Sequence, residues 1–382
     1  MKIGIEGQRL FRKKKHGMDI VALELIRRLP ELDPSNEYVI FVKDDEDKTC
    51  IQESANMRIK VLPATSYPWW EQVLLPRAAG EEGCDLLHCT SNTAPVVSRI
   101  PLITTIHDII YLEKVTLFAK GGTNYQRFGN MYRRFVVPPV AHKSCRVVTV
   151  SEFEKHNIQE VLKLGDKLRV IYNGVGTHFK KITDPNELLR ARKTYNLPER
   201  FIFFLGNTDP KKNTGNVLKA FALYKQKHDD DLYLVMPDYD ETALQELLRQ
   251  TVKPDIRSHI IMTGYVPNEE LPSIINQCIL MLYPSLRESF GIPILEGMAC
   301  GVPVITSNSS SMPEIAGDAA IQIEPTDPQA IMHAIERIIS NPVLAASLSA
   351  KGIQRAEQFS WNIMAESYIA LYKEAFNEIY HP

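Results

Sequence analysis

The chain alternates between short apolar runs and longer segments in which apolar residues recur at every third or fourth position. Short apolar runs bounded by polar loops are typical of buried strands, and the periodic segments are typical of helices packed on a sheet. The predicted strands are residues 2–6, 38–42, 85–88, 102–106, 145–150, 167–172, 201–205, 232–236, 260–262, 278–283, 302–306 and 319–323. Because strands alternate with helices in two successive series, the pattern predicts two doubly wound α/β domains with a ligand in the cleft between them.

Residues 283–307 carry the clearest local signals for a strand, a loop, a helix and a second strand. Gly291 permits a tight turn, and Pro293 suits the first turn of a helix, where no backbone N–H is required. Gly301 suits the end of that helix, and Pro303 prevents its continuation. The amides from Ser289 to Ile292 would then lie at a helix N-terminus, which is a favourable position for a phosphate.

Two carboxylates bracket this predicted phosphate site, Glu288 in the loop and Glu296 in the helix. A carboxylate beside an anion would repel it, so each glutamate is better suited to the hydroxyls of a sugar or a ribose. The alternative is that both are solvated, which is the usual state of glutamate. Glu296, however, stands among apolar residues, including Ile292 and Leu295.

Composition and charge narrow the class of protein. With 382 residues, 44% of them hydrophobic and 24% charged, the chain is long enough for two globular domains. It has no apolar run of the length that spans a membrane and no signal peptide at its start, and its six cysteines show no metal-ligand spacing. We therefore expect reduced thiols in a cytoplasmic protein.

The net charge of −2 is unevenly distributed. Residues 1–180 hold 26 Lys and Arg against 21 Asp and Glu, a balance of +5, which leaves −7 for the remainder. Neither half is basic enough to suggest a nucleic acid as partner. The basic run from Arg12 to His16 is either a solvated loop or a contact with an acidic membrane or acceptor, so peripheral association with the inner face of a membrane is an open expectation.

Residues 284–304 closely resemble the E-x7-E signature of the retaining glycosyltransferases of family 4, with Glu288 and Glu296 as its two glutamates. The resemblance implies a GT-B fold, in which two Rossmann-like domains face each other across a cleft. It implies an N-terminal acceptor-binding domain of residues 1–178, joined by a crossing helix, 362–382, and a C-terminal donor-binding domain of residues 186–361.

The family pattern also implies roles for individual residues. Glu288 would lie near the donor sugar, Glu296 would hold the ribose, and Ser289, Phe290, Gly291 and Ile292 would bind the diphosphate. Lys212 matches a lysine on the diphosphate, whereas Asn207 stands where the family has an arginine, so Arg287 or Lys211 would have to supply part of that charge. The remaining donor contacts implied are Gly17, in a reduced form of the first glycine loop, and Tyr265 and Val266, at the turn that reads the base.

His107 follows a predicted strand, and residues at the carboxyl ends of parallel strands point into the ligand cleft. A lone histidine is more often structural, and Asp108 would suit a turn cap, but the His-Asp pair resembles the family's active-site pair. We therefore place His107, with Glu288 and Lys212, among the catalytic residues. The adjacent Trp69 and Trp70 are expected to pack in a core, as tryptophans usually do.

Residues 238–240 have the D-x-D form of metal-dependent glycosyltransferases, but they begin a helix-like segment, where acids suit the dipole. We expect neither a metal nor another cofactor. The expected function is retaining transfer of a sugar from a nucleotide diphosphate sugar, GDP-mannose or a UDP-sugar, to a hydroxyl of a glycan or lipid-linked acceptor. The alternatives are a nucleotide-sugar epimerase of similar fold and a non-catalytic nucleotide-sugar-binding protein.

Overall fold

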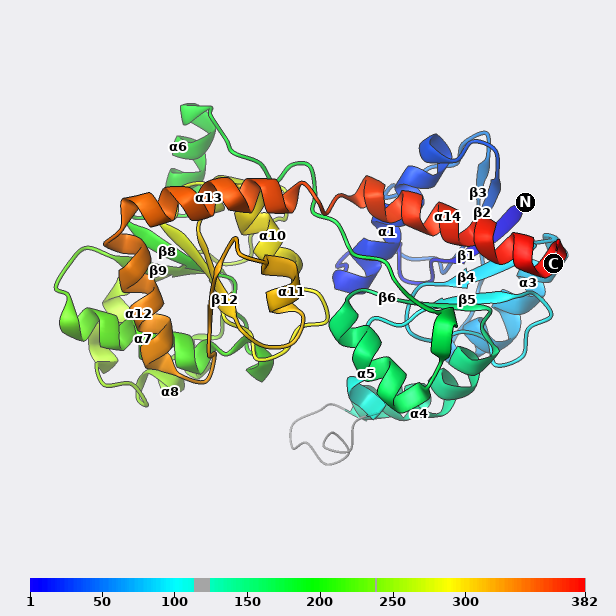
Figure 1. Ribbon diagram of the computed structural model, residues 1–382, viewed down its shortest axis with the longest axis horizontal. Helices are drawn as coiled ribbons and strands as arrows, with labels where there is room; N and C mark the ends of the chain where they lie inside the picture. Colours follow the sequence, from blue (N-terminus) through cyan, green and yellow to red (C-terminus); the bar gives the residue numbers. More distant parts are fainter. Residues whose placement is uncertain (113–123, 238, 382) are drawn as a thin grey trace. The chain divides into compact units, whose positions relative to one another are not determined.

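The computed structural model of the protein describes residues 1–112, 124–237 and 239–381. It divides into two compact units, each built around its own parallel sheet. The first unit comprises Met1–Asn173 with Trp361–Pro382, and the second comprises Gly174–Ser360. The predicted class, α/β with two doubly wound halves, is confirmed (Figure 1).

The first unit contains a seven-stranded sheet in the order β3-β2-β1-β4-β5-β6-β7, in which every described pairing is parallel. Its strands are β1 (Lys2–Glu6), β2 (Glu37–Val42), β3 (Met57–Val61), β4 (Leu86–Cys89), β5 (Leu102–Thr105), β6 (Arg146–Thr149) and β7 (Leu168–Val170). Its helices are α1 (Gly17–Leu32), α2 (Tyr67–Trp69), the π-helix η1 (Trp70–Leu74), α3 (Leu75–Glu81), η2 (Ile110–Leu112), α4 (Asn124–Lys143), α5 (Glu152–Leu162), η4 (Gly165–Lys167) and α14 (Trp361–Tyr380). Figure 1 shows α1 and α14 along one face of this sheet and α4 and α5 along the other.

The second unit contains a six-stranded parallel sheet in the order β10-β9-β8-β11-β12-β13. Its strands are β8 (Phe201–Phe204), β9 (Tyr233–Met236), β10 (Ile260–Met262), β11 (Leu280–Tyr283), β12 (Val304–Ser307) and β13 (Ile321–Ile323). Its helices are α6 (Pro185–Thr194), η5 (Pro210–Lys212), α7 (Thr214–Lys227), α8 (Glu241–Leu248), η6 (Pro254–His259), α9 (Leu271–Ile275), α10 (Ile292–Ala299), α11 (Met312–Ala316), α12 (Pro328–Ile339) and α13 (Pro342–Ala356). The strands β8 and β11 are wholly buried because α7 and α12 cover one face of the sheet and α10 and α13 the other (Figure 1).

Several strands begin later than the apolar runs predicted, including the two that flank the loop and helix of residues 283–307. β11 begins at Leu280 rather than at Cys278, and β12 begins at Val304 rather than at Val302. Pro303 explains the second difference, because it has no N–H to donate to the ladder; its carbonyl instead accepts a hydrogen bond from Met281 N at 2.9 Å.

The last helix, α14, packs on the first unit, as the family resemblance implied. Tyr368 and Tyr372 on its buried face reach polar groups of the first sheet. The hydroxyl of Tyr368 lies 2.9 Å from Thr105 Oγ1, and that of Tyr372 lies 2.7 Å from Nδ1 of His88. None of the helices in the described part of the chain combines the length and hydrophobicity that a membrane-spanning segment needs.

The two adjacent tryptophans differ in a way that the sequence did not predict. Trp70 is fully buried, as expected, but Trp69 is 54% exposed, so the expectation that both pack in the core is wrong for Trp69. Consecutive residues on a helix point in different directions, and the transition from α2 to the π-helix η1 at this point turns Trp70 inward.

Candidate active site

The order of the strands marks one position in each sheet where a ligand is expected. The chain order reverses between β1 and β4 in the first sheet and between β8 and β11 in the second. In open α/β sheets, ligands bind outside the carboxyl ends of the strands at such a switch point. Both positions carry buried polar residues, among them Glu296 in the second unit and His107 in the first.

At the second switch point, Lys212 and Glu288 are brought together from loops that are far apart in the sequence. Lys212 Nζ lies 2.7 Å from Glu288 Oε1 and donates to the hydroxyl of Tyr283 at 2.8 Å. The ammonium group also lies 4.9 Å from the centre of the Tyr283 ring. Burial is the main cause of a Tyr283 pKa well above its usual value, so its hydroxyl is protonated beside the ion pair.

The loop that carries Lys212 is fixed by its neighbour Asn213. Asn213 adopts a left-handed conformation, with φ of 63°, and its side-chain amide donates to the carbonyls of Pro284 at 2.9 Å and of Pro325 at 2.6 Å. These bonds tie the loop after β8 to the loop after β11, which holds the lysine beside Glu288.

The loop that carries Glu288 is held by a run of serines after β12. Glu288 N donates to Ser310 Oγ at 3.0 Å, and Ser311 Oγ lies 2.9 Å from the carbonyl oxygen of Glu288 and 2.8 Å from that of Phe290. Gly291, with φ of 103°, then turns the chain into α10, where an added Cβ would lie 3.1 Å from Ile294. The tight turn and the helix start predicted at Gly291 are confirmed.

Glu296 lies in the second turn of α10 and is 7% exposed. Burial raises the pKa of its carboxyl to about 7, and the charge of Lys212 opposes this rise. Glu296 is therefore a buried carboxyl that titrates near neutrality close to the Lys212 ammonium. The reading of Glu296 as a solvated residue is excluded by its burial.

The other predicted donor residues surround this edge of the second sheet. Asn207 follows β8, and its side-chain oxygen accepts a hydrogen bond from Asp209 N at 2.9 Å, a local turn contact. Tyr265, 70% exposed, and Val266, 8% exposed, follow β10, two strands away from β8. The remaining predicted residues of the loop, half-buried or buried, are Arg287, Ser289, Phe290 and Ile292.

At the first switch point, a carboxylate joins the two strands. Glu6, at the end of β1, accepts hydrogen bonds from Thr90 N at 3.2 Å and from Gln8 N at 2.9 Å. His107 is 5% exposed, and its Nε2 lies 2.9 Å from the carbonyl oxygen of Thr90. A carbonyl only accepts, so Nε2 carries the proton, and burial lowers the pKa of the ring, which keeps it neutral.

Two residues of this region were not predicted from the sequence. Asp19, in the first turn of α1, is 2% exposed; its Oδ2 accepts from His16 N at 3.0 Å, whereas Oδ1 has no protein partner among the described residues. Gln8 is 7% exposed, and its Oε1 likewise has no protein partner there. The available signal for Asp19 was its place on the apolar face of α1, four residues before Leu23. Gly17, at the exposed start of α1, has open space around it.

No metal site emerges from the described residues. Within 1–112, 124–237 and 239–381, no group of three or more His, Cys, Asp or Glu is arranged to hold an ion. Of the D-x-D sequence, Asp238 lies outside the described residues, and Asp240 caps α8 by accepting from Ala243 N at 2.7 Å. Asp108 similarly accepts from Ile110 N at 3.2 Å, the local turn contact considered for it.

Comparison with known proteins identifies relatives of both units. Residues 16–179 match the family model described as Glycosyltransferase Family 4, and residues 186–355 match that described as Glycosyl transferases group 1. O-antigen chain mannosyltransferase B from Escherichia coli is 31% identical over 233 residues, which are 59% of this chain and 60% of that protein. The serotype-specific mannosyltransferase WbdA from E. coli is 29% identical over 240 residues, 60% of this chain but only 29% of its own length.

A sucrose-phosphate synthase from Thermosynechococcus elongatus has a similar structure, with a TM-score of 0.76 over 99% of both chains at 18% identity. At this level of identity, the likeness establishes a shared GT-B fold. The match covers less than two thirds of the length of either of the two E. coli mannosyltransferases described above.

Proposed function

Because the chain belongs to glycosyltransferase family 4, we propose that it transfers a sugar from a nucleotide diphosphate sugar to a hydroxyl group, with retention of the anomeric configuration. The observation that carries the proposal is the Lys212–Glu288 pair at the switch point of the second sheet. The acceptor is a glycan or a lipid-linked glycan. GDP-mannose is the first donor to test, because the E. coli relatives are named mannosyltransferases, and a UDP-sugar is the second.

Lys212 supplies the positive charge that the diphosphate needs as it leaves. The phosphate oxygens would approach Lys212 and the amides from Ser289 to Ile292 at the start of α10, where the helix dipole also favours negative charge. Preorganised groups of this kind stabilise charge that develops in the transition state. Lys212, with Arg287 as a second candidate, takes the place of a metal ion in this proposal.

Glu296 anchors the ribose, and Glu288 orients the donor sugar. A carboxylate accepts hydrogen bonds from hydroxyl groups, and the position of Glu296 behind the phosphate site suits the ribose. The contact between Lys212 Nζ and Oε1 of Glu288 fixes the orientation of this carboxylate, and therefore the direction in which its second oxygen points. Tyr265 and Val266, two strands away on the same sheet edge, would contact the base.

We propose the retaining course because the resemblance to family 4 implies it, and the roles given to the two carboxylates are compatible with it. A retaining glycosidase needs a nucleophile and an acid about 5 Å apart at one anomeric carbon. Here one carboxylate is assigned to the ribose, so the departing phosphate itself takes the proton of the acceptor hydroxyl on the same face of the sugar. We assign the acceptor to the first unit, where the neutral His107 and the oxygens of Asp19 and Gln8 that have no partner among the described residues can accept hydrogen bonds from hydroxyls.

The test is acceptor-dependent release of the nucleotide. The protein is incubated with GDP-mannose, UDP-glucose or another UDP-sugar, with and without a glycan acceptor, and the nucleoside diphosphate and the extended glycan are measured. We expect one donor to give both products only when the acceptor is present. Conversion of the donor sugar without acceptor would instead support an epimerase, and binding without turnover would support a non-catalytic protein.

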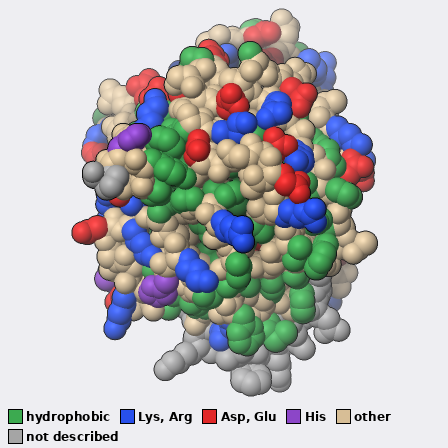
Figure 2. All heavy atoms as spheres, turned by 90° about the vertical axis from the view of Figure 1, so that its right-hand side faces the viewer, with side chains coloured by type: hydrophobic (Ala, Val, Ile, Leu, Met, Phe, Trp, Pro, Cys, Tyr) green, Lys and Arg blue, Asp and Glu red, His purple; other side chains and the backbone are tan. Residues whose placement is uncertain are grey.

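We further propose that α4 rests on an anionic membrane surface. Its outward stripe carries Phe128, Met131 and Phe135, which are 54%, 52% and 75% exposed. The outward face of a helix that contacts only water would carry polar residues at these positions. The sequence of α4 contains no Asp or Glu, and Arg133 and Arg134 flank the stripe. Figure 2 shows hydrophobic side chains with basic ones beside them on the lower part of this face of the first unit. Aromatic residues with basic neighbours are typical of interfacial helices.

Vesicle sedimentation tests this surface. We expect binding to vesicles containing phosphatidylserine and loss of most of that binding in the double variant Phe128→Ser/Phe135→Ser, because each phenylalanine contributes apolar area to the interface. Val343→Ser, at an 80% exposed position of the second unit, is the matched control. Equal sedimentation of the wild type with anionic and with neutral vesicles, or no sedimentation with either, would contradict the proposal.

A further inference from the structure

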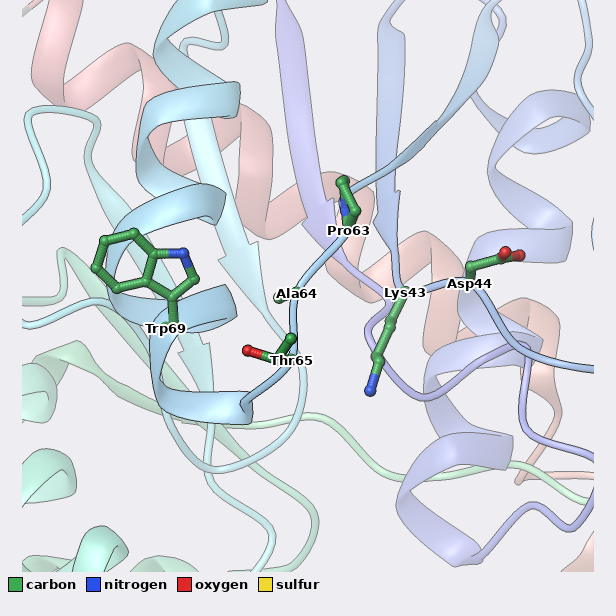
Figure 3. A pocket seen from close by; sticks show the side chains of 6 residues that line it. All are labelled: Lys43, Asp44, Pro63, Ala64, Thr65 and Trp69. Atoms are coloured by element: carbon green, nitrogen blue, oxygen red, sulfur yellow. The ribbon is translucent and has the colours of Figure 1, made fainter.

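A hollow of about 520 Å³ opens at the carboxyl ends of β2 and β3 in the first unit. Figure 3 shows Trp69 on one side of the segment from Pro63 to Thr65 and Lys43 on the other. The residues that line the hollow are Lys43, Asp44, Pro63, Ala64, Thr65 and Trp69. None of the roles proposed so far uses this hollow.

One wall of the hollow is fixed by the tryptophan that is buried behind it. Trp70 Nε1 donates to the carbonyl of Leu62 at 3.1 Å, immediately before the lining segment. Trp69, the last residue of α2, directly precedes the π-helix η1, and its indole is exposed at the rim. π-helical turns occur frequently at functional sites. The backbone that carries the exposed ring is therefore anchored through its buried neighbour Trp70.

The groups around the hollow fit a carbohydrate. The flat indole of Trp69 can pack against the apolar face of a sugar ring, while the Lys43 ammonium and the Thr65 hydroxyl can bond to its hydroxyls. Asp44 points away from the other lining side chains (Figure 3), and its carboxylate lies 2.6 Å from Lys48 Nζ. A pocket with an aromatic wall and a few polar groups is suited to a small organic ligand.

The strand order sets the distance between this hollow and the acceptor residues. Three strand spacings separate β2 from β5, which His107 follows, so the two places are about 14 Å apart at about 4.8 Å per spacing. A single sugar ring cannot reach both. A ligand that fills the hollow and presents a hydroxyl near His107 must be an oligosaccharide.

Polar residues follow β1 and β4, the two strands that lie between β2 and β5 in the sheet. The guanidinium carbon of Arg9 lies 5.5 Å from the ring centre of Tyr67, and the Tyr67 hydroxyl lies 2.7 Å from Thr93 Oγ1. The Oε1 of Gln8 and the Nε of Arg9 are buried without a protein partner among the described residues. We assign these two atoms, Gln8 Oε1 and Arg9 Nε, to hydroxyls of the ligand, because buried polar atoms are normally hydrogen-bonded.

We propose that the hollow is a distal subsite that holds the acceptor glycan several sugars away from the hydroxyl that reacts. This inference rests on the proposed function, because it takes the acceptor to be a glycan bound to the first unit. It implies that the protein extends an existing oligosaccharide and uses a monosaccharide acceptor poorly.

Tryptophan fluorescence tests binding without requiring turnover. Trp69 is 54% exposed, whereas the other two tryptophans are buried: Trp70 is 0% exposed and Trp361 is 3% exposed. Titration with linear manno-oligosaccharides of increasing length should therefore change the emission of Trp69 only with the longer ones. Trp69→Ala should lose both the emission change and the affinity, whereas Trp69→Phe, which also lacks the reporting indole, should retain affinity when binding is measured by calorimetry. No change with any oligosaccharide would overturn the subsite, whether or not the protein proves to be a transferase.

Acceptor kinetics provide the second readout. We expect Trp69→Ala to raise the KM for the longest acceptor about twofold to twelvefold, since an aromatic contact contributes about 0.5–1.5 kcal/mol, and to leave the KM of the donor unchanged. Val97→Ala, at a 76% exposed apolar position of the same unit, is the control. An equal change for long and short acceptors would show that Trp69 supports the fold rather than the glycan. Failure of transfer with every acceptor would refute the proposed function, while the fluorescence titration would still decide the subsite.

Discussion

Replacing Lys212 with methionine should lower kcat about 100- to 1,000-fold, the loss typical of removing one preorganised group that stabilises developing charge. The ammonium group is the cation bound to Glu288 and Tyr283 at the switch point of the second sheet. Methionine preserves the length of the side chain but removes its charge. Steady-state kinetics with the donor identified by the nucleotide-release assay measure the effect.

Lys351→Met is the matched control for this substitution. Lys351 also belongs to the second unit and forms an ion pair, at 2.6 Å with Asp318, but its side chain is 47% exposed and lies outside the site. We expect its kcat to remain within twofold of the wild type, about 0.4 kcal/mol in barrier height. Thermal unfolding of both variants separates loss of chemistry from loss of fold. A Lys212→Met protein that is folded and fully active would refute the role given to the lysine.

Replacing Glu296 with glutamine should stabilise the unliganded protein by about 3 kcal/mol at pH 8, and by almost nothing at pH 4.5. Burial raises the pKa of this carboxyl from 4.5 to about 7, and each pKa unit corresponds to about 1.4 kcal/mol. Because the folded pKa is the higher one, the folded state binds more protons between pH 4.5 and 7. The wild type therefore loses stability as the pH rises through this window.

Urea unfolding, followed through the transition of the second unit and repeated between pH 4.5 and 8.5, measures the free energy of unfolding of both proteins. Glu357→Gln, at an exposed position of the same unit, should show the pH dependence of the wild type. The glutamine variant should also bind the donor more weakly at pH 8, because it lacks the carboxylate that accepts from the ribose. Parallel stability curves for the wild type and Glu296→Gln would contradict the burial argument.

The local signals in the sequence predicted much of the second unit's site. Gly291 and Gly301 mark the turn into α10 and its end, and both have positive φ in the structure. The contact between Lys212 and Glu288 was beyond local reasoning, because it depends on β8 and β11 becoming neighbours. The family resemblance placed both residues at the donor site, but it did not predict that their side chains contact each other.

The first unit shows where local reasoning fails. Asp19 has the spacing of an apolar helix position, and only the packing of α1 reveals that its carboxylate is buried. The different environments of Trp69 and Trp70 result from a π-helical turn that no periodicity in the sequence indicates. The same turn creates the exposed indole on which the proposed glycan subsite depends.

Proton NMR of the extended glycan tests the central claim most directly. The protein is incubated with its donor and an oligosaccharide acceptor, and the coupling constant of the new anomeric proton is compared with that of the donor sugar. The account predicts a new glycosidic bond with the donor's anomeric configuration, formed at the rate of nucleotide release. An inverted linkage, or release of the nucleotide with only free or epimerised sugar, would contradict it.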